Sequence, residues 1–249
     1  GFLRREAFRR NYASGRFSPR PGGDSAIRRH VFEAELDYIT GSDDGVLETR
    51  EAQVSYRAEL RGNDQWNINV ADKYEFLREG FNVIPGQRIP AGAYSFADFR
   101  TSYVLGPQRR VSGTISGGTG SFYGGTNTEL AYRGTVAISN RFNFEPSITL
   151  NWITLPGLTT DAAERSFNTQ VIGSRVSYMF SPWMAVSALV QYNSTSSSLG
   201  SSVRFRWEYA PGSDLFIVYS DGRNTQIGDR FPALLNRTFV VKATRLLRF

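Results

Sequence analysis

The feature that most constrains this sequence is an alternation of apolar and polar residues that recurs along most of its length. It is clearest at the C-terminal end. There the odd-numbered positions, which form one parity of the strand, include Phe239, Val241, Ala243, Leu247 and Phe249. The other parity holds Val240, Lys242, Thr244, Leu246 and Arg248. A period of two predicts a β-strand with one apolar and one more polar face. This strand is also longer than the five or six residues usual in soluble domains.

The same alternation predicts about thirteen strands and no helix. The pattern is regular over residues 32–38, 54–60, 66–76, 184–192 and 203–209. Residues 2–17 are rich in Arg and alternate only loosely, and we interpret them as a first strand. Near Asp98 the alternation slips by one residue, as a β-bulge would cause. No apolar run approaches the roughly 20 residues that a membrane-spanning helix needs.

The connections between these strands alternate in length. The shorter ones are Ser18–Ser25, Arg61–Asp64, Gly106–Arg109, Ser139–Arg141, Ser181–Trp183 and Ala210–Asp214. The longer ones are Thr40–Gly45, Arg78–Ala91, the Gly-rich Ser116–Asn127, Pro156–Ser166, Ser194–Gly200 and Asp221–Pro232. Short turns at one end and long loops at the other are typical of outer-membrane barrels. The sequence therefore predicts an all-β, antiparallel up-and-down transmembrane β-barrel of about 12–16 strands, formed by residues 1–249 as one domain.

The strand count bears on what precedes the chain. A single-chain bacterial barrel normally has an even number of strands, with both ends on the periplasmic side. An odd count therefore predicts either a C-terminal fragment of a longer barrel protein or an error of one strand in the assignment. The sequence begins with Gly1 and shows no signal segment at its start.

Charged residues on the polar parity are the candidate functional residues. On the lipid side of a barrel, each Arg or Lys near the membrane midplane would cost about 2–4 kcal/mol. We therefore expect these side chains to point inward, where they could form a structural ladder of ion pairs or line an aqueous path that selects solutes. The predicted lumen-lining residues are Glu33, Glu35, Asp37, Arg57, Glu59, Lys73, Glu75, Arg133, Arg175, Arg204, Arg206, Glu208 and Lys242.

Two stretches near the C-terminus carry a family resemblance. They are the text from Leu189 to Thr225, which contains QYN, RFRWEY and PGSDLF, and the terminal RTFVVKATRLLRF. This text resembles an uncharacterised outer-membrane barrel domain that commonly follows a carbohydrate-binding family-nine-like module in Gram-negative proteins. GFLRRE at the start resembles an internal segment of the same domain, so the resemblance extends over the whole chain and is sharp in its C-terminal quarter.

The last strand also resembles the C-terminal signature of bacterial outer-membrane barrels. Its apolar positions Phe239, Val241, Leu247 and Phe249 are the predicted membrane-insertion signal. This resemblance implies that the outer-membrane barrel assembly machinery is a partner, recognising the C-terminal strand. Together the two resemblances imply a multi-pass barrel in the Gram-negative outer membrane, in contact with its lipid.

The activity of that family is not established, so three functions stay open. The leading hypothesis is a passive pore or a channel that binds solutes or glycans. The first alternative is a closed barrel that anchors, or serves as assembly platform for, another domain or a periplasmic or surface partner. An outer-membrane hydrolase is the weakest alternative, so we predict no enzyme activity and no cofactor.

Other site chemistries have little support in the sequence. The formal net charge of +6 could suggest nucleic acid, but the Arg residues are spread among alternating strands and no nucleic-acid-binding motif is present. The absence of Cys excludes disulfides and thiolate metal sites. The Gly-rich segment Gly117–Gly125 lacks the Lys-Ser/Thr of a phosphate-binding loop.

Two further motifs could support a catalytic or a metal site, the single histidine and an acidic loop. His30 is the only histidine and would be the base of a hydrolase, with the carboxylates of residues 33, 35 and 37 nearby in sequence. Its position at the start of a strand favours a histidine at the membrane interface instead. Asp43, Asp44 and Glu48 carry hard oxygen ligands for calcium, but their spacing differs from an EF-hand loop. We therefore predict no catalytic and no metal-binding residue.

Overall fold

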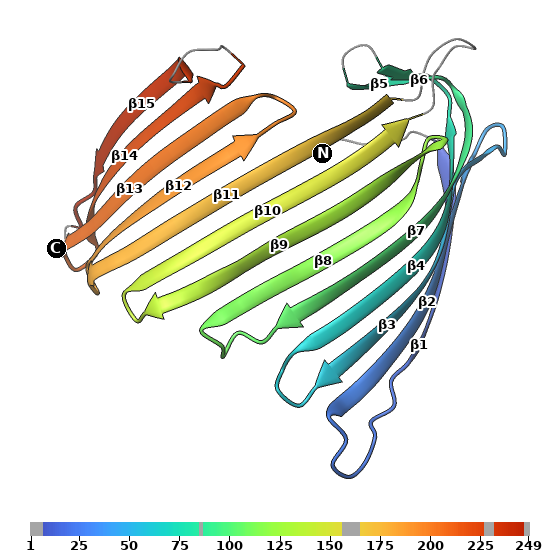
Figure 1. Ribbon diagram of the computed structural model, residues 1–249, viewed down its shortest axis with the longest axis horizontal. Helices are drawn as coiled ribbons and strands as arrows, with labels where there is room; N and C mark the ends of the chain where they lie inside the picture. The colour runs from blue at the N-terminus through green and yellow to red at the C-terminus, as the bar shows by residue number, and fades with distance from the viewer. Residues whose placement is uncertain (1–6, 85–86, 156–164, 227–231, 247–249) are drawn as a thin grey trace. The chain divides into compact units, whose positions relative to one another are not determined.

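The computed structural model describes residues 7–84, 87–155, 165–226 and 232–246, and the described residues form strands and turns without a helix. Thirteen strands form one antiparallel sheet whose order follows the chain, and β5 and β6 form a separate hairpin (Figure 1). The predicted all-β up-and-down architecture is therefore confirmed. No helix in the described ranges is long and apolar enough to cross a membrane. The strands are β1 Phe8–Phe17, β2 Ile27–Gly41, β3 Leu47–Leu60, β4 Gln65–Leu77, β5 Phe81–Ile84, β6 Gln87–Ile89, β7 Gly92–Leu105, β8 Val111–Phe122, β9 Gly125–Ser139, β10 Phe142–Leu155, β11 Arg165–Ser181, β12 Met184–Asn193, β13 Ser198–Ala210, β14 Ser213–Asn224 and β15 Ala233–Ala243.

The chain divides into two compact units, which are described separately. Unit 1 contains residues 1–106, 116–130 and 151–168, and unit 2 contains residues 107–115, 131–150 and 169–249. Strands β1 to β7 thus belong to unit 1 and strands β12 to β15 to unit 2, whereas β8 to β11 each contribute to both.

Strand register gives unit 1 two chemically different faces. Phe32 on β2 is opposite Tyr56 on β3, which is opposite Ile68 on β4, so these side chains share one face. We call this the apolar face, and it also carries Val54, Val70 and Phe99. The residues between them in sequence point to the other side, which we call the polar face. The pairing of neighbouring strands therefore places the alternating apolar residues of each strand on the same face of the sheet.

Unit 2 repeats this separation of faces. Val203 on β13 is opposite Ala188 on β12 and Tyr219 on β14, and Tyr219 is opposite Phe239 on β15. The neighbouring pair Phe205 and Ile217 continues the same apolar face toward Val241. Each unit is thus a single layer of sheet with an apolar and a polar side.

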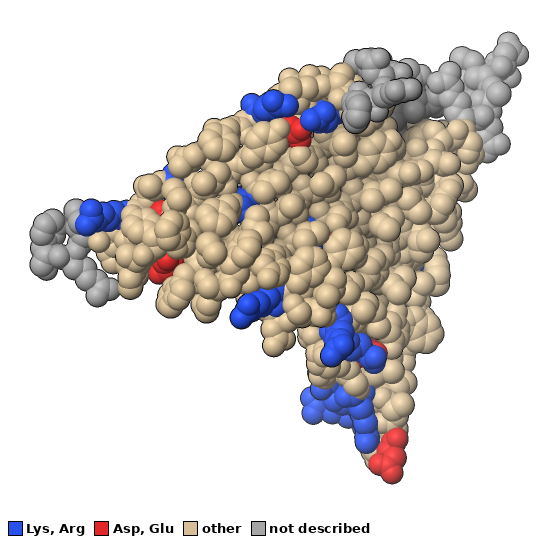
Figure 2. All heavy atoms as spheres, turned by 60° about the vertical axis from the view of Figure 1, so that its left-hand side comes forward, with Lys and Arg blue, Asp and Glu red and all other residues tan. Residues whose placement is uncertain are grey.

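Few apolar side chains are buried in this layer. Among the described residues the buried apolar positions are Val31, Ala58, Ala71, Ile89 and Leu155. In contrast, Val54 is 61% exposed and Phe239 66% exposed. The view in Figure 2 shows a face where Lys, Arg, Asp and Glu are sparse and lie mostly toward its margins. Exposed apolar area of this extent marks an interaction surface rather than a surface in contact with water.

Several predicted long loops are shorter in the structure. The Gly-rich segment forms the end of β8 and the start of β9, joined by a two-residue turn at Tyr123 and Gly124 with φ of 45° and 83°. Positive φ at both central residues is the geometry of a tight hairpin turn. Residues 194–197 are likewise a turn, whereas 18–26 form a longer connection than predicted. The predicted rhythm of short and long connections is therefore wrong at these places, and most of Pro156–Ser166 and part of Asp221–Pro232 lie outside the described residues.

The bulge predicted near Asp98 is absent from the pairing of β7 with β4. Their register runs without interruption from Leu77 opposite Gly92 to Gln65 opposite Val104. The slip in the sequence has another cause, because Phe96 lies on the polar face opposite Lys73. There it joins a cluster of aromatic rings, so an apolar residue occupies a position of polar parity.

Candidate functional site

The polar face of unit 1 collects the charged residues that the sequence placed on the polar parity. Across β2, β3 and β4, residues 33, 35 and 37 face Ser55, Gln53 and Glu51, which in turn face Asn69, Ala71 and Lys73. The predicted residues that share this face are Glu33, Glu35, Asp37, Arg57, Glu59, Lys73 and Glu75. Whether this face lines a lumen stays a prediction.

Cross-strand hydrogen bonds link much of this face. The Arg10 guanidinium donates from Nε to Oδ1 of Asp37 at 2.7 Å. At the next pair of facing residues on this side of the sheet, Nε2 of Gln53 donates to Oε2 of Glu35 at 2.6 Å. Nδ2 of Asn69 donates to Oε1 of Gln53 at 3.2 Å. These bonds cross from strand to strand, so they link the four neighbouring strands β1, β2, β3 and β4.

The densest ionic row crosses β3, β4 and β7. Lys73 Nζ lies 3.1 Å from Oε1 of Glu51 and 3.7 Å from Oδ2 of Asp98. Asp98 also accepts from Nε of Arg100 at 3.1 Å. The sequence prediction included Lys73 but missed Glu51, Asp98 and Arg100. Asp98 and Arg100 have the same parity as Phe96. Because Phe96 is apolar, the sequence pattern does not assign this parity of β7 to the polar face.

Two cavities open beside this row. One, of about 210 Å³, is lined in part by Lys73, Phe96, Arg100 and Glu129 and by β8 residues Gly118–Phe122. The second, of about 180 Å³, shares Arg100 and Glu129 and adds Asn67, Asn69, Ser102 and Ser116. Charged, amide and hydroxyl groups and the two rings of Phe96 and Phe122 thus line two cavities that share Arg100 and Glu129, and together we call them the β7–β8 groove.

Glycines allow β8 to approach β7 closely along this groove. A Cβ added at Gly120 would lie 2.6 Å from the carbonyl oxygen of Ala97, and one at Gly118 would lie 3.0 Å from that of Phe99. Both distances are shorter than ordinary van der Waals contact. The Gly-rich text therefore reflects tight strand packing and not a loop.

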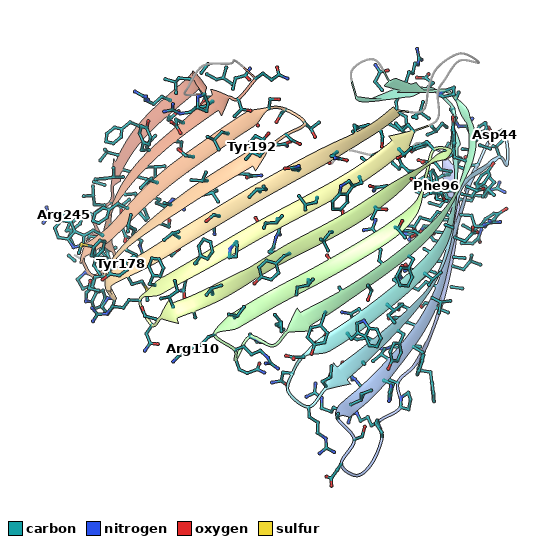
Figure 3. The ribbon with its side chains drawn as sticks, viewed as in Figure 1. Asp44, Phe96, Arg110, Tyr178, Tyr192 and Arg245 are labelled. Carbon is teal, nitrogen blue, oxygen red and sulfur yellow. The ribbon has the colours of Figure 1, made fainter. Side chains whose placement is uncertain are left out.

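An aromatic cluster bounds the groove at the end where β8 turns into β9. Phe96 lies toward the same end of the strands as Asp44 in the loop after β2 (Figure 3). The ring of Tyr123 contacts those of Phe81, Tyr94, Phe96 and Phe122 at centroid distances of 4.9–5.5 Å. Its hydroxyl donates to Oε2 of Glu75 at 2.8 Å. Burial, reinforced by this hydrogen bond and the carboxylate charge, raises the pKa of Tyr123 well above its ordinary value.

The loop after β2 is held by ion pairs that bear on the calcium hypothesis. Asp44 Oδ1 accepts from the backbone N–H of Val46 at 3.1 Å, and Arg78 Nη2 lies 2.8 Å from both Asp44 and Glu48. These contacts, the backbone hydrogen bond foremost, hold the pKa of Asp44 below its usual range. Arg78 thus pairs with two of the three carboxylates that the calcium hypothesis invokes, Asp44 and Glu48. The described chain contains no group of three or more His, Asp or Glu that could hold a metal ion.

Unit 2 carries a second polar surface around β9, β10 and β11. A cavity of about 470 Å³ is lined by residues that include Arg133, Glu145, Arg175 and Gln191. Arg175 Nη1 lies 3.9 Å from Oε2 of Glu145, so this pair is looser than the ionic row of unit 1. Two predicted residues, Arg133 and Arg175, therefore line one cavity.

The remaining predicted residues lie on the polar face of β13 and β15. Arg206 is opposite Phe216, which is opposite Lys242, and Glu208 is on the same parity. Arg206 Nε donates to Oδ1 of Asp214 at 3.0 Å, whereas Arg204 has no ion pair among the described residues. Both arginines thus lie on the polar face, one compensated and one not.

The predicted insertion signal is described only in part. Phe239 and Val241 lie on the apolar face of β15 and are 66% and 54% exposed. Leu247 and Phe249 lie outside the described residues. The two described positions have the exposure that contact with lipid or an assembly factor would require.

His30 does not meet the carboxylates that a hydrolase would need. Its Nδ1 lies 2.9 Å from the Tyr56 hydroxyl, and its ring stacks against those of Tyr56 and Phe32. His30 has the parity of Phe32, on the apolar face, whereas residues 33, 35 and 37 point to the other side. The residues that the sequence placed close together are therefore separated by the sheet itself.

The strand order and the two faces define the class of this chain, an antiparallel β-meander with one polar and one apolar side in each unit. Comparison with protein-family models, with curated proteins and with solved structures finds no match. The candidate site therefore rests on the geometry of the chain alone.

Proposed function

We propose that this chain forms an outer-membrane β-barrel whose polar face lines a path for hydrophilic solutes. One observation carries the proposal. Long strands expose large apolar side chains on one face and place charged side chains on the other, and few apolar side chains of the described residues are buried. Such a sheet is unstable in water, because the exposed apolar area remains unburied. Lipid would cover the apolar face and water would solvate the polar one, as in a transmembrane barrel.

The β7–β8 groove supports solute contact along that path. It combines Lys73, Arg100 and Glu129 with amide groups and the ring of Phe96. Hydroxyl-rich solutes bind through such mixtures of hydrogen-bonding groups and an aromatic surface. Sugars or glycans as the solute class rest on the family resemblance and are an analogy.

The remaining parts of the proposal follow from the same resemblance. The location is the Gram-negative outer membrane, with its lipid against the apolar face. The assembly machinery for outer-membrane barrels would recognise β15 and the residues after it. No enzymatic step is proposed.

A closed barrel that anchors a partner is the second candidate, and the ion-pair ladder favours it. Lys73, Glu51, Asp98 and Arg100 satisfy one another across three strands. A network of this kind stabilises a sheet whether or not solute passes beside it.

Conductance in planar lipid bilayers distinguishes the two functions. A pore predicts stepwise conductance whose ion selectivity shifts toward cations in Arg204→Gln, because this arginine lies uncompensated on the polar face. Arg237→Gln is the matched control, since it removes the same charge from the opposite face, where Arg237 pairs in register with Asp221. Silence from a barrel that is folded by circular dichroism would contradict the pore and favour the anchor. Equal selectivity shifts in both variants would contradict the assignment of faces.

A further inference from the structure

A separate cluster of arginines lies where the β1–β2 connection meets the start of β2 and the end of β3. Arg28 and Arg29 both reach Glu59, Arg28 Nη2 at 3.2 Å from Oε2 and Arg29 Nη2 in contact with Oε1. A register shift between Ile27 and Arg29 explains this arrangement, because it places an additional residue opposite β3. A β-bulge of this kind redirects a side chain, and here it brings two guanidinium groups to one carboxylate.

The charges of this cluster do not balance. A cavity of about 360 Å³ is lined by Arg20, Arg28, Arg29 and Glu59. Glu59 is only 5% exposed, and it is the one carboxylate among three guanidinium groups. Arg20 has no hydrogen-bond or ion-pair partner in the described part of the chain. The cavity therefore carries an excess of two positive charges.

An unused hydrogen-bond donor lies in the same place. Nε of Arg29 is buried and has no hydrogen-bond partner among the described residues. A buried donor without a partner is unusual in a folded protein and calls for an acceptor. Glu59 is the one carboxylate that lines the cavity, and Nη2 atoms of both arginines already share it, so the lining offers this donor no further carboxylate.

The loop that carries Arg20 is anchored close to the cavity. The backbone N–H of His30 donates to the carbonyl of Pro19 at 2.9 Å, directly before Arg20. The other end is held by N–H of Arg61, which donates to the carbonyl of Ala26 at 3.0 Å. In Figure 2, Lys and Arg gather toward the lower end of the view, where the β1–β2 connection lies in Figure 1. The backbone of the loop is thus held beside the cavity, where Glu59 fixes the guanidinium groups of Arg28 and Arg29.

We propose that this cavity is a binding site for a phosphate group. Guanidinium groups match the planar, bidentate hydrogen-bonding geometry of phosphate oxygens, and three of them can surround one anion. The same chemistry accepts the phosphate of a lipid headgroup or a free phosphate. The inference shares Glu59 with the polar face, but it uses neither Arg204 nor any residue of the β7–β8 groove, on which the proposed solute path depends.

Titration calorimetry of the folded chain in uncharged maltoside micelles tests the site with inorganic phosphate as the probe. Arg20→Gln is the informative variant, because Arg20 supports no described ion pair and its loss leaves the Arg28–Arg29–Glu59 cluster intact. We expect phosphate affinity to fall at least tenfold in Arg20→Gln. Arg9→Gln, which removes an exposed charge from β1, should bind phosphate as the unchanged chain does. Absence of phosphate binding, or equal weakening in both variants, would overturn the proposal.

A second arm distinguishes the two sources of phosphate. The titration is repeated in nanodiscs of phosphatidylcholine with and without phosphatidylglycerol. If a lipid headgroup occupies the site, phosphatidylglycerol weakens binding of inorganic phosphate in the unchanged chain, and Arg20→Gln removes this competition. If the ligand is free phosphate, the affinity in both nanodiscs equals that in the maltoside micelles, whose detergent contains no phosphate. Either result supports the site, provided that Arg20→Gln lowers phosphate affinity in the first arm.

Discussion

The hydrogen bond from Tyr123 to Glu75 gives the sharpest test of how the β8–β9 turn is held. Tyr123→Phe removes one hydroxyl and leaves the ring among its aromatic neighbours. The lost bond, 2.8 Å long, has a carboxylate as acceptor. Hydrogen bonds to charged groups contribute about 1.5–3 kcal/mol. Because both side chains are half-buried and water can reach Glu75, we expect the free energy of unfolding to fall by about 1–2 kcal/mol.

The matched control is a second tyrosine of the same cluster. Tyr94 donates from its hydroxyl to the carbonyl of Pro90 at 2.8 Å, so this acceptor is neutral. Tyr94→Phe makes the same chemical change at a bond of equal length, and we expect a smaller loss. Urea unfolding of both variants in lipid vesicles, followed by Trp fluorescence, measures the difference.

The pH dependence of the Tyr123→Phe effect supplies an independent check. The pKa of Tyr123 is raised in the folded chain, so the unfolded chain loses its phenolic proton first as pH rises. The contribution of Tyr123 is therefore complete below the unfolded pKa of ~10 and declines as pH rises from there toward the folded value. The stability difference between the unchanged chain and Tyr123→Phe should shrink above that pH. Equal losses in the two Tyr→Phe variants, or a difference that grows with pH, would refute this reasoning.

Three further predictions address the faces, the strand packing and the loop after β2. Val203→Arg on the apolar face should lower the free energy of unfolding in vesicles by about 2–4 kcal/mol, the cost of an arginine at the membrane midplane. Ser202→Arg, next in sequence but on the polar face, should change this free energy little. A larger loss in Ser202→Arg than in Val203→Arg would contradict the assigned faces. Gly120→Ala should destabilise the sheet by about 1–3 kcal/mol through overpacking, whereas Gly15→Ala, which meets no atom within 4 Å, should not; thermal unfolding compares them. The pKa of Asp44 is lowered in the folded chain, so the contribution of Asp44 to the free energy of unfolding is complete above the unfolded pKa of ~3.9 and is lost as pH falls through the folded value. The stability difference between the unchanged chain and Asp44→Asn should therefore disappear on acidification. A difference that does not change with pH would contradict this role of Asp44.

The sequence determined the architecture because period-two alternation is a local property of the chain. Strands of ten or more residues, and the assignment of Glu33, Arg57, Lys73 and Arg204 to the polar side, followed from parity. Parity survives folding because neighbouring strands pair in register and side chains at paired positions share a face. The chain could thus be divided into two faces before any pairing was known.

Tertiary structure decided which polar residues act together. Asp98 and Arg100 join Lys73 only because β7 pairs with β4 across the β5–β6 hairpin. Glycine favours turns in isolation, so the sequence alone predicts a loop for the Gly-rich segment. In the structure it forms strands, and the missing Cβ at Gly120 allows β8 to lie close to β7. Local pattern cannot report such contacts, since they depend on which strand becomes the neighbour.

The arginine cavity shows the same limit most clearly. The sequence presents Arg28 and Arg29 as ordinary strand residues of opposite parity, which should point to opposite faces. A register shift brings both to Glu59, and the β1–β2 connection adds Arg20 from eight positions earlier in the chain. Alternation fixes the direction of a side chain only where pairing is regular. Where it is not, three-dimensional pairing alone determines which charges meet.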